Sequence, residues 1–364
     1  MRDIIAELKA LKNATPTPLL DIEVVEKLSS SKVPILLWGC GNYAEYIYQI
    51  LKRNKIKIEG VFIDHKIGVL KFHEFEVLSF DEVKDKFTKI IIVRGNGNIE
   101  REAYYKSIDI VDTIFSFFDL MGFGWYLSNE KLETYSETLN QMFNEYSDDE
   151  SKKSFIAYLK SRYFNDWTYI QAHVCHNMYF PEFIKINNQE SVVDCGAFDG
   201  DTLKLFVNKT DEWNNYIAFE PSNIPYEELN RYIEANDFQK IKTHKVGVWN
   251  KKTTLSFVEE NDISRIVEGA ISNGTRIEVD ALDNLCNAVP VTYIKMDLEG
   301  SELVALEGAC NIILKNKPKL AISIYHKPSD LVNIYLFIKK MNLEYKFYFR
   351  IHTKVGSDAV LYAI

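Results

Sequence analysis

Twice along the chain, a short apolar run typical of a buried strand ends in a glycine-containing turn and leads into a segment with helical spacing. The first run is VPILLW, at residues 33–38, and Gly39-Cys40-Gly41 follows it. The second is VVDC, at residues 192–195, and Gly196 follows it. Strand-like and helical segments alternate after both turns. This alternation predicts parallel sheets joined by crossover helices, so the chain is expected to be an α/β protein.

The length of 364 residues is sufficient for two domains. The first α/β pattern predicts a Rossmann-like domain over residues 1–122, and the second predicts a larger α/β domain over residues 186–364. Residues 123–185 are polar, rich in tyrosine and helical in period, so we expect a helical connector there. Within it, Ser147 and Glu150 have the spacing of a capping box, which predicts the start of a helix.

The end of the chain has a different pattern from the rest of the larger domain. Its last two apolar runs, LEYKFYFRIH and DAVLYAI, have no helical segment between them. Two strands without a crossover helix predict a hairpin, so we expect the last strand to run antiparallel in an otherwise parallel sheet.

Charge and cysteine usage limit the classes of partner and compartment. The formal net charge of −9 argues against a protein that grips the nucleic-acid backbone, which needs clustered Lys and Arg. The five cysteines are scattered and form no CxxC pair, as expected of reduced thiols in a cytosol. The N-terminus lacks the apolar region of a signal peptide, and the most apolar stretch, residues 113–128, is shorter than the ~20 residues of a spanning helix. We predict a cytoplasmic protein without a nucleic-acid partner or a transmembrane segment.

The second glycine turn predicts a binding site, because open α/β sheets bind ligands at the carboxyl ends of their strands. In VVDCGAFDGDT, Asp194 is placed where its carboxylate can accept a hydrogen bond from a cationic amino group. Four carboxylates are expected here or at the neighbouring strand end: Asp194, Asp199, Asp201 and Glu220. They would repel a pyrophosphate, so a cationic sulfonium cofactor, S-adenosyl-L-methionine, fits this site better than NAD.

Glu220 and Gly196 extend this hypothesis. Glu220 ends the next strand, in AFEP, 24 residues after Gly196. An acidic residue at that position can bind both hydroxyls of a ribose. Gly196 allows the backbone to turn sharply and to approach a ligand where a Cβ atom would collide.

Several runs of the second half together resemble a known family. VVDCGAFDGDT, AFEP, VGVWNKKTTLSF, IEVDALDNL and YIKMDLEGSELVALEGA are similar, in order, to motifs of the FkbM-type methyltransferases, over roughly residues 150–364. IKMDLEGSE is the most specific of them. The resemblance implies a class I methyltransferase fold, with a seven-stranded mixed sheet, and methylation of hydroxyl oxygens, often on sugars or natural products. It also implies a cofactor site formed by Asp194, Gly196, Ala197, Asp201, Thr202 and Glu220, with Asp297 at the methyl end. Asp283 matches a further acidic position of the family.

A hydroxyl is a poor nucleophile, so a positioned base should assist its methylation. His326 ends the strand-like run KLAISIYH, and we predict it as the base because histidine can titrate near neutrality. Asp297 is the second predicted catalytic residue, either as the base or by orienting the cofactor. Alternatively, both residues could only cap the helices that follow them.

No metal site is predicted. A divalent ion at Asp297 would need a second and a third ligand, and none is apparent in the sequence. His173, Cys175 and His176 are close in sequence, but their spacing matches no four-ligand zinc pattern, so we interpret them as packing residues.

The first glycine turn has the pattern of a dinucleotide-binding fingerprint, with Gly39, Gly41 and Ala44 at the opening of a helix. Asp64 ends the next strand, 23 residues after Gly41, where a ribose-binding acid belongs. We predict a nucleotide or nucleotide-sugar site at Gly39, Gly41 and Asp64, although the same turn also occurs where it serves packing alone. Arg94 could contact a phosphate or form a surface salt bridge.

The combined prediction is an S-adenosyl-L-methionine-dependent O-methyltransferase that acts on a hydroxyl of a sugar or glycan precursor in polysaccharide biosynthesis. Its partner would be a small-molecule or glycan acceptor, which could be nucleotide-linked. One alternative is an NAD-dependent oxidoreductase that uses the N-terminal domain. Another is a non-catalytic nucleotide- or sugar-binding protein.

Overall fold

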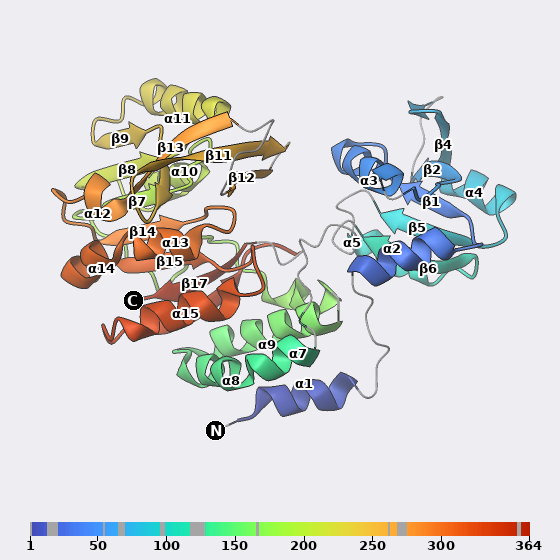
Figure 1. Cartoon of the computed structure of the whole chain (residues 1–364), viewed down its shortest axis with the longest axis horizontal. Helices are drawn as coiled ribbons and strands as arrows, with labels where there is room; N and C mark the ends of the chain where they lie inside the picture. Colours follow the sequence, from blue (N-terminus) through green and yellow to red (C-terminus); the bar gives the residue numbers. More distant parts are fainter. Residues whose placement is uncertain are drawn as a thin grey trace. The chain divides into compact units, whose positions relative to one another are not determined.

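The computed structural model describes residues 2–12, 21–53, 55–64, 70–94, 99–116, 127, 129–164, 167–260, 263–267, 275–354 and 358–364. Residue contacts divide the chain into two compact units (Figure 1). The smaller unit is residues 16–126. The larger unit is residues 127–364 together with residues 1–15.

The smaller unit contains a six-stranded sheet in the order β3-β4-β2-β1-β5-β6. All neighbouring strands pair in parallel except β3 and β4. The strands are β1 Ile35–Trp38, β2 Gly60–Ile63, β3 Lys71–Phe72, β4 Phe75–Ser79, β5 Ile90–Arg94 and β6 Val111–Ser116. The helices are α2 Asp21–Ser30, α3 Asn42–Arg53, α4 Phe80–Lys86 and α5 Ile99–Lys106.

Strand β1 shows why this sheet needs helices on both faces. All four of its residues are buried. Because successive side chains of a strand point to opposite faces, Ile35 and Leu37 enter one hydrophobic cluster while Leu36 and Trp38 enter another. A strand that is buried on both faces is typical of a parallel sheet covered by helices.

The larger unit contains a seven-stranded sheet in the order β16-β17-β15-β14-β7-β8-β9. Its strands are β7 Ser191–Cys195, β8 Asn215–Phe219, β9 Ile241–His244, β14 Tyr293–Met296, β15 Lys319–Ser323, β16 Phe347–Ile351 and β17 Ala359–Ala363. Strand β17 pairs antiparallel with both β15 and β16, and the remaining pairs are parallel. The prediction of a terminal hairpin with an antiparallel last strand is confirmed.

The same unit contains a second, four-stranded sheet in the order β10-β13-β11-β12. Its strands are β10 Gly247–Trp249, β11 Thr253–Glu260, β12 Ile263–Val267 and β13 Thr275–Ala281. The run 241–249 has the pattern of one strand, yet it is divided between β9 and β10, which belong to different sheets. The helices are α10 Asp201–Val207, α11 Asn223–Ala235, α12 Leu282–Leu285, α13 Glu302–Glu307, α14 Cys310–Asn316 and α15 Asp330–Lys340.

Residues 127–185 of the predicted connector belong to this unit. The helices of the connector are α7 Asn129–Thr134, α8 Ser136–Glu145, α9 Asp149–Phe164 and the 3₁₀ helix η1 Trp167–His173. Helix α9 contacts β16, and α8 contacts α15. At the start of α9, Asp148 accepts a hydrogen bond from the backbone N–H of Ser151 at 2.7 Å and pairs with Arg350 of β16. Asp148, not the predicted Ser147, therefore caps this helix, because the Asp148 side chain accepts from an N–H of its first turn. Ser147 precedes the cap and donates its backbone N–H to Phe347 of β16.

The N-terminal helix does not follow the predicted domain boundaries, which divided the chain into residues 1–122, 123–185 and 186–364. Helix α1, Ile4–Lys12, lies beside α8 (Figure 1). Its apolar Ile4 and Leu8 are buried, and the backbone N–H of Ile4 donates to Asn140 of α8 at 3.0 Å. The helix thus belongs to the larger unit. Within the described residues, no helix is both long enough and apolar enough to cross a membrane.

His352 at the end of β16 should make the larger unit sensitive to acid. Its ring nitrogens contact the Cys175 carbonyl at 2.7 Å and the Tyr362 hydroxyl at 2.8 Å, and burial lowers the pKa of His352 to about 4. The unfolded chain, with an ordinary histidine pKa of about 6.5, binds a proton first, so stability is complete above about pH 6.5 and falls by up to roughly 3 kcal/mol toward pH 4.

Urea unfolding of the wild type and of His352→Gln between pH 7.5 and pH 4.5 measures the contribution of His352 to the pH dependence of stability. The variant should be less stable at pH 7.5 but should lose less stability than the wild type on acidification. The exposed His176→Gln variant is the matched control and should follow the wild type. Equal acid sensitivity in His352→Gln and the wild type would contradict the assignment.

Candidate functional site

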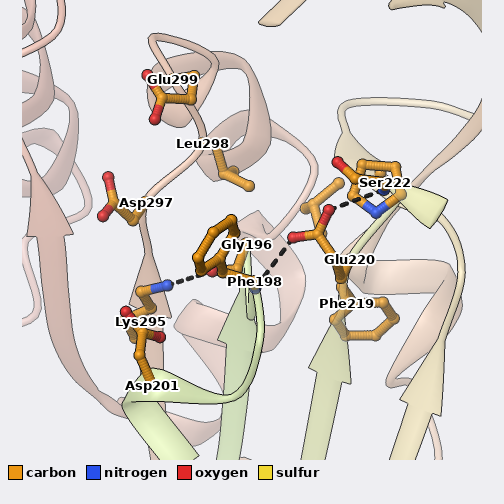
Figure 2. Close-up of a pocket in the computed structure, with 13 residues that line it drawn as sticks. Gly196, Phe198, Asp201, Phe219, Glu220, Ser222, Lys295, Asp297, Leu298 and Glu299 are labelled. Atoms are coloured by element: carbon orange, nitrogen blue, oxygen red, sulfur yellow. Dashed lines mark hydrogen bonds between the residues drawn. The ribbon is translucent and has the colours of Figure 1, made fainter. Parts of the chain in front are cut away.

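A pocket of about 260 Å³ lies at the carboxyl ends of β7, β8 and β14 (Figure 2). Its lining includes Gly196, Asp201, Glu220, Lys295, Asp297 and Glu299. In Figure 2, Asp297 and Glu299 lie on one side of Gly196 and Glu220 lies on the other. The sheet thus brings together residues that are about a hundred positions apart in the sequence.

The turn after β7 depends on Gly196. Its φ is +79°, and a Cβ atom at this position would lie 2.0 Å from the carbonyl oxygen of Asp297. The glycine is therefore needed for the close approach of the chain's own β14 loop, which is a different reason from the expected approach to a ligand. The backbone N–H groups of Gly196 and Ala197 both donate to the Phe219 carbonyl, so the turn is also tied to β8.

Asp194 lies below the pocket rather than in its lining. Its side chain is 0% exposed, its carboxylate pairs with the Lys295 ammonium at 3.1 Å, and it accepts a hydrogen bond from the Tyr216 hydroxyl at 2.7 Å. The cationic amino group that Asp194 meets is thus provided by the chain itself. The expected direct contact with a ligand is not what this arrangement supports.

Lys295 is the basic residue among the described residues that line the pocket. Burial alone would lower the pKa of Lys295, but the charges of Asp194, Asp297 and Asp201 outweigh burial and raise it, so the ammonium stays charged. Its Nζ donates to the carbonyl of Gly196 at 2.5 Å. Sequence reasoning did not assign Lys295 a role, although a lysine inside a buried strand is itself a signal of a paired charge.

Glu220 lies at the end of β8 with its carboxylate fixed by the backbone. One oxygen accepts from the N–H of Phe198 at 3.0 Å and the other from the N–H of Ser222 at 2.8 Å. Burial raises the pKa of Glu220, and these hydrogen bonds act in the opposite direction. Because each carboxylate oxygen has a second lone pair, Glu220 can still accept hydrogen bonds from a ligand.

Of the other predicted cofactor residues, one lines the pocket and two are buried behind the turn. Asp201 lines the pocket at the first turn of α10 and accepts a hydrogen bond from the N–H of Thr202. Thr202 and Ala197 are fully buried and shape the turn from behind. Asp199 pairs with Lys204 at 2.9 Å, and Asp283 accepts from the first N–H groups of α14, so both have local structural partners.

The lining carries an excess of negative charge. Four carboxylates, those of Asp201, Glu220, Asp297 and Glu299, stand against the single ammonium of Lys295. Such a pocket favours a ligand with cationic groups and disfavours a pyrophosphate.

His326 follows β15 and is surrounded by carboxylates. Its Nδ1 lies 2.9 Å from Glu302 Oε1, and its Nε2 lies 3.3 Å from Glu299 Oε2 and 3.6 Å from Asp297 Oδ1. Burial alone would lower the pKa of His326, but the three carboxylates raise it well above its ordinary value. An imidazolium cannot accept a proton, so the prediction that His326 is the base does not fit this arrangement.

Asp297 does not cap the following helix. Its carboxylate accepts hydrogen bonds from the hydroxyls of Tyr179 at 2.7 Å and Tyr325 at 3.3 Å. Tyr179 comes from the segment after η1, so residues outside the β-α core complete the site. No sequence pattern pointed to Tyr179.

The predicted nucleotide site of the smaller unit has a different environment. Gly39, with φ of +118°, donates its N–H to Phe62, while a Cβ atom on Gly41 would meet nothing within 4 Å. Asp64 accepts hydrogen bonds from Trp38, Arg101 and Tyr105 and is therefore already engaged. Arg94 is buried and pairs with Glu102 at 3.4 Å, so it is not a surface salt bridge. Nucleotide binding by Gly39, Gly41 and Asp64 stays a prediction.

Residues 194–347 match the family model described as the methyltransferase FkbM domain. The chain is similar to the crystal structure of methyltransferase FkbM from Methylobacillus flagellatus KT, with a TM-score of 0.79 and 20% identity over 99% of this chain and 98% of that one. It has a weaker likeness to an rRNA methylase from Streptococcus thermophilus, with a TM-score of 0.32 and 14% identity over 49% of this chain and 87% of that one. It also has a weaker likeness to fibrillarin from Aeropyrum pernix, with a TM-score of 0.30 and 12% identity over 50% of this chain and 70% of that one. No curated protein matches the sequence.

The likeness over almost the whole of both chains shows that this protein has the fold of a solved methyltransferase. The two weaker likenesses are too low to bear on function. Residues 194–347 form a methyltransferase FkbM domain, so the resemblance that the motifs predicted is confirmed.

The contact between Gly196 and Asp297 predicts a position that tolerates no side chain. Gly196→Ala should lower the free energy of unfolding by at least about 2 kcal/mol, because the new Cβ atom collides with a backbone oxygen and the residue has a positive φ. Gly41→Ala, which introduces the same methyl group into open space, should change it by less than about 0.5 kcal/mol. Denaturant unfolding of the two variants measures both changes. A Gly196→Ala variant as stable as the wild type would contradict the close contact between Gly196 and Asp297.

Because Lys295 and Asp194 form a buried ion pair under the pocket, the effects of substituting them on stability should be strongly coupled. Lys295→Met should destabilise the protein by about 3–5 kcal/mol, because it leaves the Asp194 carboxylate buried and unpaired. Adding Asp194→Asn to Lys295→Met should recover part of that loss. A double-mutant cycle from denaturant unfolding measures the coupling, and strictly additive effects would show that the pair does not form.

Proposed function

We propose that the larger unit is an S-adenosyl-L-methionine-dependent O-methyltransferase. The observation that carries the proposal is the charge pattern of the pocket, with Glu220 at one end and Asp297 and Glu299 at the other (Figure 2). The FkbM domain at residues 194–347 supports the reaction type. The sheet order, with its last strand antiparallel, is the arrangement expected for a class I methyltransferase.

The lining residues fit this cofactor. S-adenosyl-L-methionine, when bound, supplies an activated methyl group on a cationic sulfur. Glu220 would accept hydrogen bonds from the ribose hydroxyls. Asp201 and Asp297 would face the cationic groups, and the carboxyl end of the amino acid would lie nearest Lys295.

Asp297 has the central place in the reaction. It is the carboxylate of the lining that is fixed by two tyrosine hydroxyls, and it lies at the methyl end of the proposed cofactor position. It would accept a hydrogen bond from the acceptor hydroxyl and hold that oxygen in line with the methyl group. Positioning of this kind is the main contribution that a protein can make when the cofactor carries the reactive group.

The acceptor class rests on the family resemblance. We propose a hydroxyl of a sugar or glycan precursor as the methyl acceptor. A screen of nucleotide-sugars and glycans with labelled methyl donor tests this part, and incorporation into another class of acceptor would revise it.

Ligand titration tests the cofactor. S-adenosylhomocysteine should bind the wild type, and Glu220→Gln should weaken binding about 10- to 100-fold, the range expected for charged hydrogen bonds to the ribose. Glu227→Gln, an exposed acidic-to-amide change on α11, is the matched control and should bind as the wild type does. NADH fluorescence should not respond. Binding of NADH without binding of S-adenosylhomocysteine would overturn the proposal.

A further inference from the structure

A cluster of potential metal ligands adjoins the pocket at Asp297. Asp297 follows β14, Glu302 begins α13, and His326 follows the neighbouring strand β15. One possible ligand atom from each of these three residues lies within 4.8 Å of the other two. The sequence separates Asp297 and His326 by 29 positions, so the cluster is created by the pairing of β14 with β15.

Two members of the cluster are buried without adequate hydrogen bonds. The Glu302 side chain is 0% exposed and the His326 side chain is 5% exposed. Glu302 Oε1 accepts from the N–H of Leu298, but its Oε2 has no hydrogen-bond partner. Both ring nitrogens of His326 also lack one, because the contacts with the carboxylates have ion-pair distances without hydrogen-bond geometry. Buried polar atoms without a hydrogen-bond partner destabilise the folded protein and point to a missing ligand.

The charges of the cluster also favour a cation. The three carboxylates of Asp297, Glu299 and Glu302 surround a single imidazolium, so negative charge is in excess. The nearby Lys327 does not offset them directly, because its ammonium donates to the Gly300 carbonyl. A divalent ion would offset this negative charge and satisfy the buried oxygen and nitrogen atoms together.

We propose that Asp297, Glu302 and one ring nitrogen of His326 bind a divalent transition-metal ion such as Mn²⁺, and that the imidazolium releases one ring proton to solvent when the ion binds. Two carboxylate oxygens with one imidazole nitrogen are a ligand set that such ions accept, whereas Mg²⁺ and Ca²⁺ favour oxygen ligands alone. Three protein ligands leave coordination positions open. Glu299, which is 35% exposed beside the cluster, could contribute to one of them.

The position of the ion gives it a use in the proposed reaction. Asp297 belongs to both the cluster and the pocket lining, so the ion would lie at the methyl end of the pocket. There it could bind the acceptor hydroxyl and make that oxygen a better nucleophile. This use rests on the proposed function, whereas binding of the ion does not.

Mn²⁺ binding to the full chain, after removal of metals with a chelator, tests the site directly. Electron paramagnetic resonance of free Mn²⁺ should show one saturable site per chain. His326→Gln and Asp297→Asn should each weaken it at least 10-fold, and the exposed His176→Gln should not. Saturating Mn²⁺ should also raise the unfolding temperature of the wild type and of His176→Gln, but not of His326→Gln.

The outcomes separate the two proposals. Absence of saturable Mn²⁺ binding, or binding that His326→Gln and Asp297→Asn leave unchanged, overturns the metal site. S-adenosylhomocysteine binding is measured in parallel on the same protein without metal. If the cofactor analogue binds and Mn²⁺ does not, the metal site fails and the proposed function stands; if only Mn²⁺ binds, the metal site stands and the proposed function fails.

Discussion

The buried ion pair between Lys295 and Asp194 is the interaction on which the rest of the site depends. It joins the neighbouring strands β14 and β7 at their carboxyl ends, where both side chains are almost completely excluded from solvent. Since a buried charge is tolerated only with a partner, the pair fixes the lysine at the floor of the pocket. The same ammonium donates to the carbonyl of Gly196, which sets the course of the turn above it.

The ion pair between Lys295 and Asp194 also determines the electrostatics of the pocket. Lys295 neutralises Asp194 below the pocket, whereas the carboxylates of the lining face the cavity. Two of these lining carboxylates are held by local hydrogen bonds. Glu220 is fixed by backbone N–H groups and Asp297 by two tyrosine hydroxyls. Preorganised carboxylates at opposite ends suit a ligand that has hydroxyls at one end and positive charge at the other. This is the physical basis for the proposed cofactor.

The architecture was predictable from the sequence to the extent that it depends on local pattern. Alternating strands and helices predicted the α/β fold, and the absence of a helix between the last two runs predicted the antiparallel β17. Local pattern does not show where one strand changes sheets, so the division of residues 241–249 was missed. It also does not reveal which groups face each other across strands. For that reason Asp194 was expected to contact a ligand rather than Lys295, and His326 was expected to act as a base rather than to be an imidazolium among carboxylates.

A crystal structure of the protein with S-adenosylhomocysteine tests the central claim most directly. The ribose of the analogue should lie against Glu220 and its amino acid end beside Asp201, Asp297 and Lys295, across the carboxyl ends of β7 and β8. An analogue bound elsewhere, or a pocket that admits a dinucleotide in its place, would contradict the account.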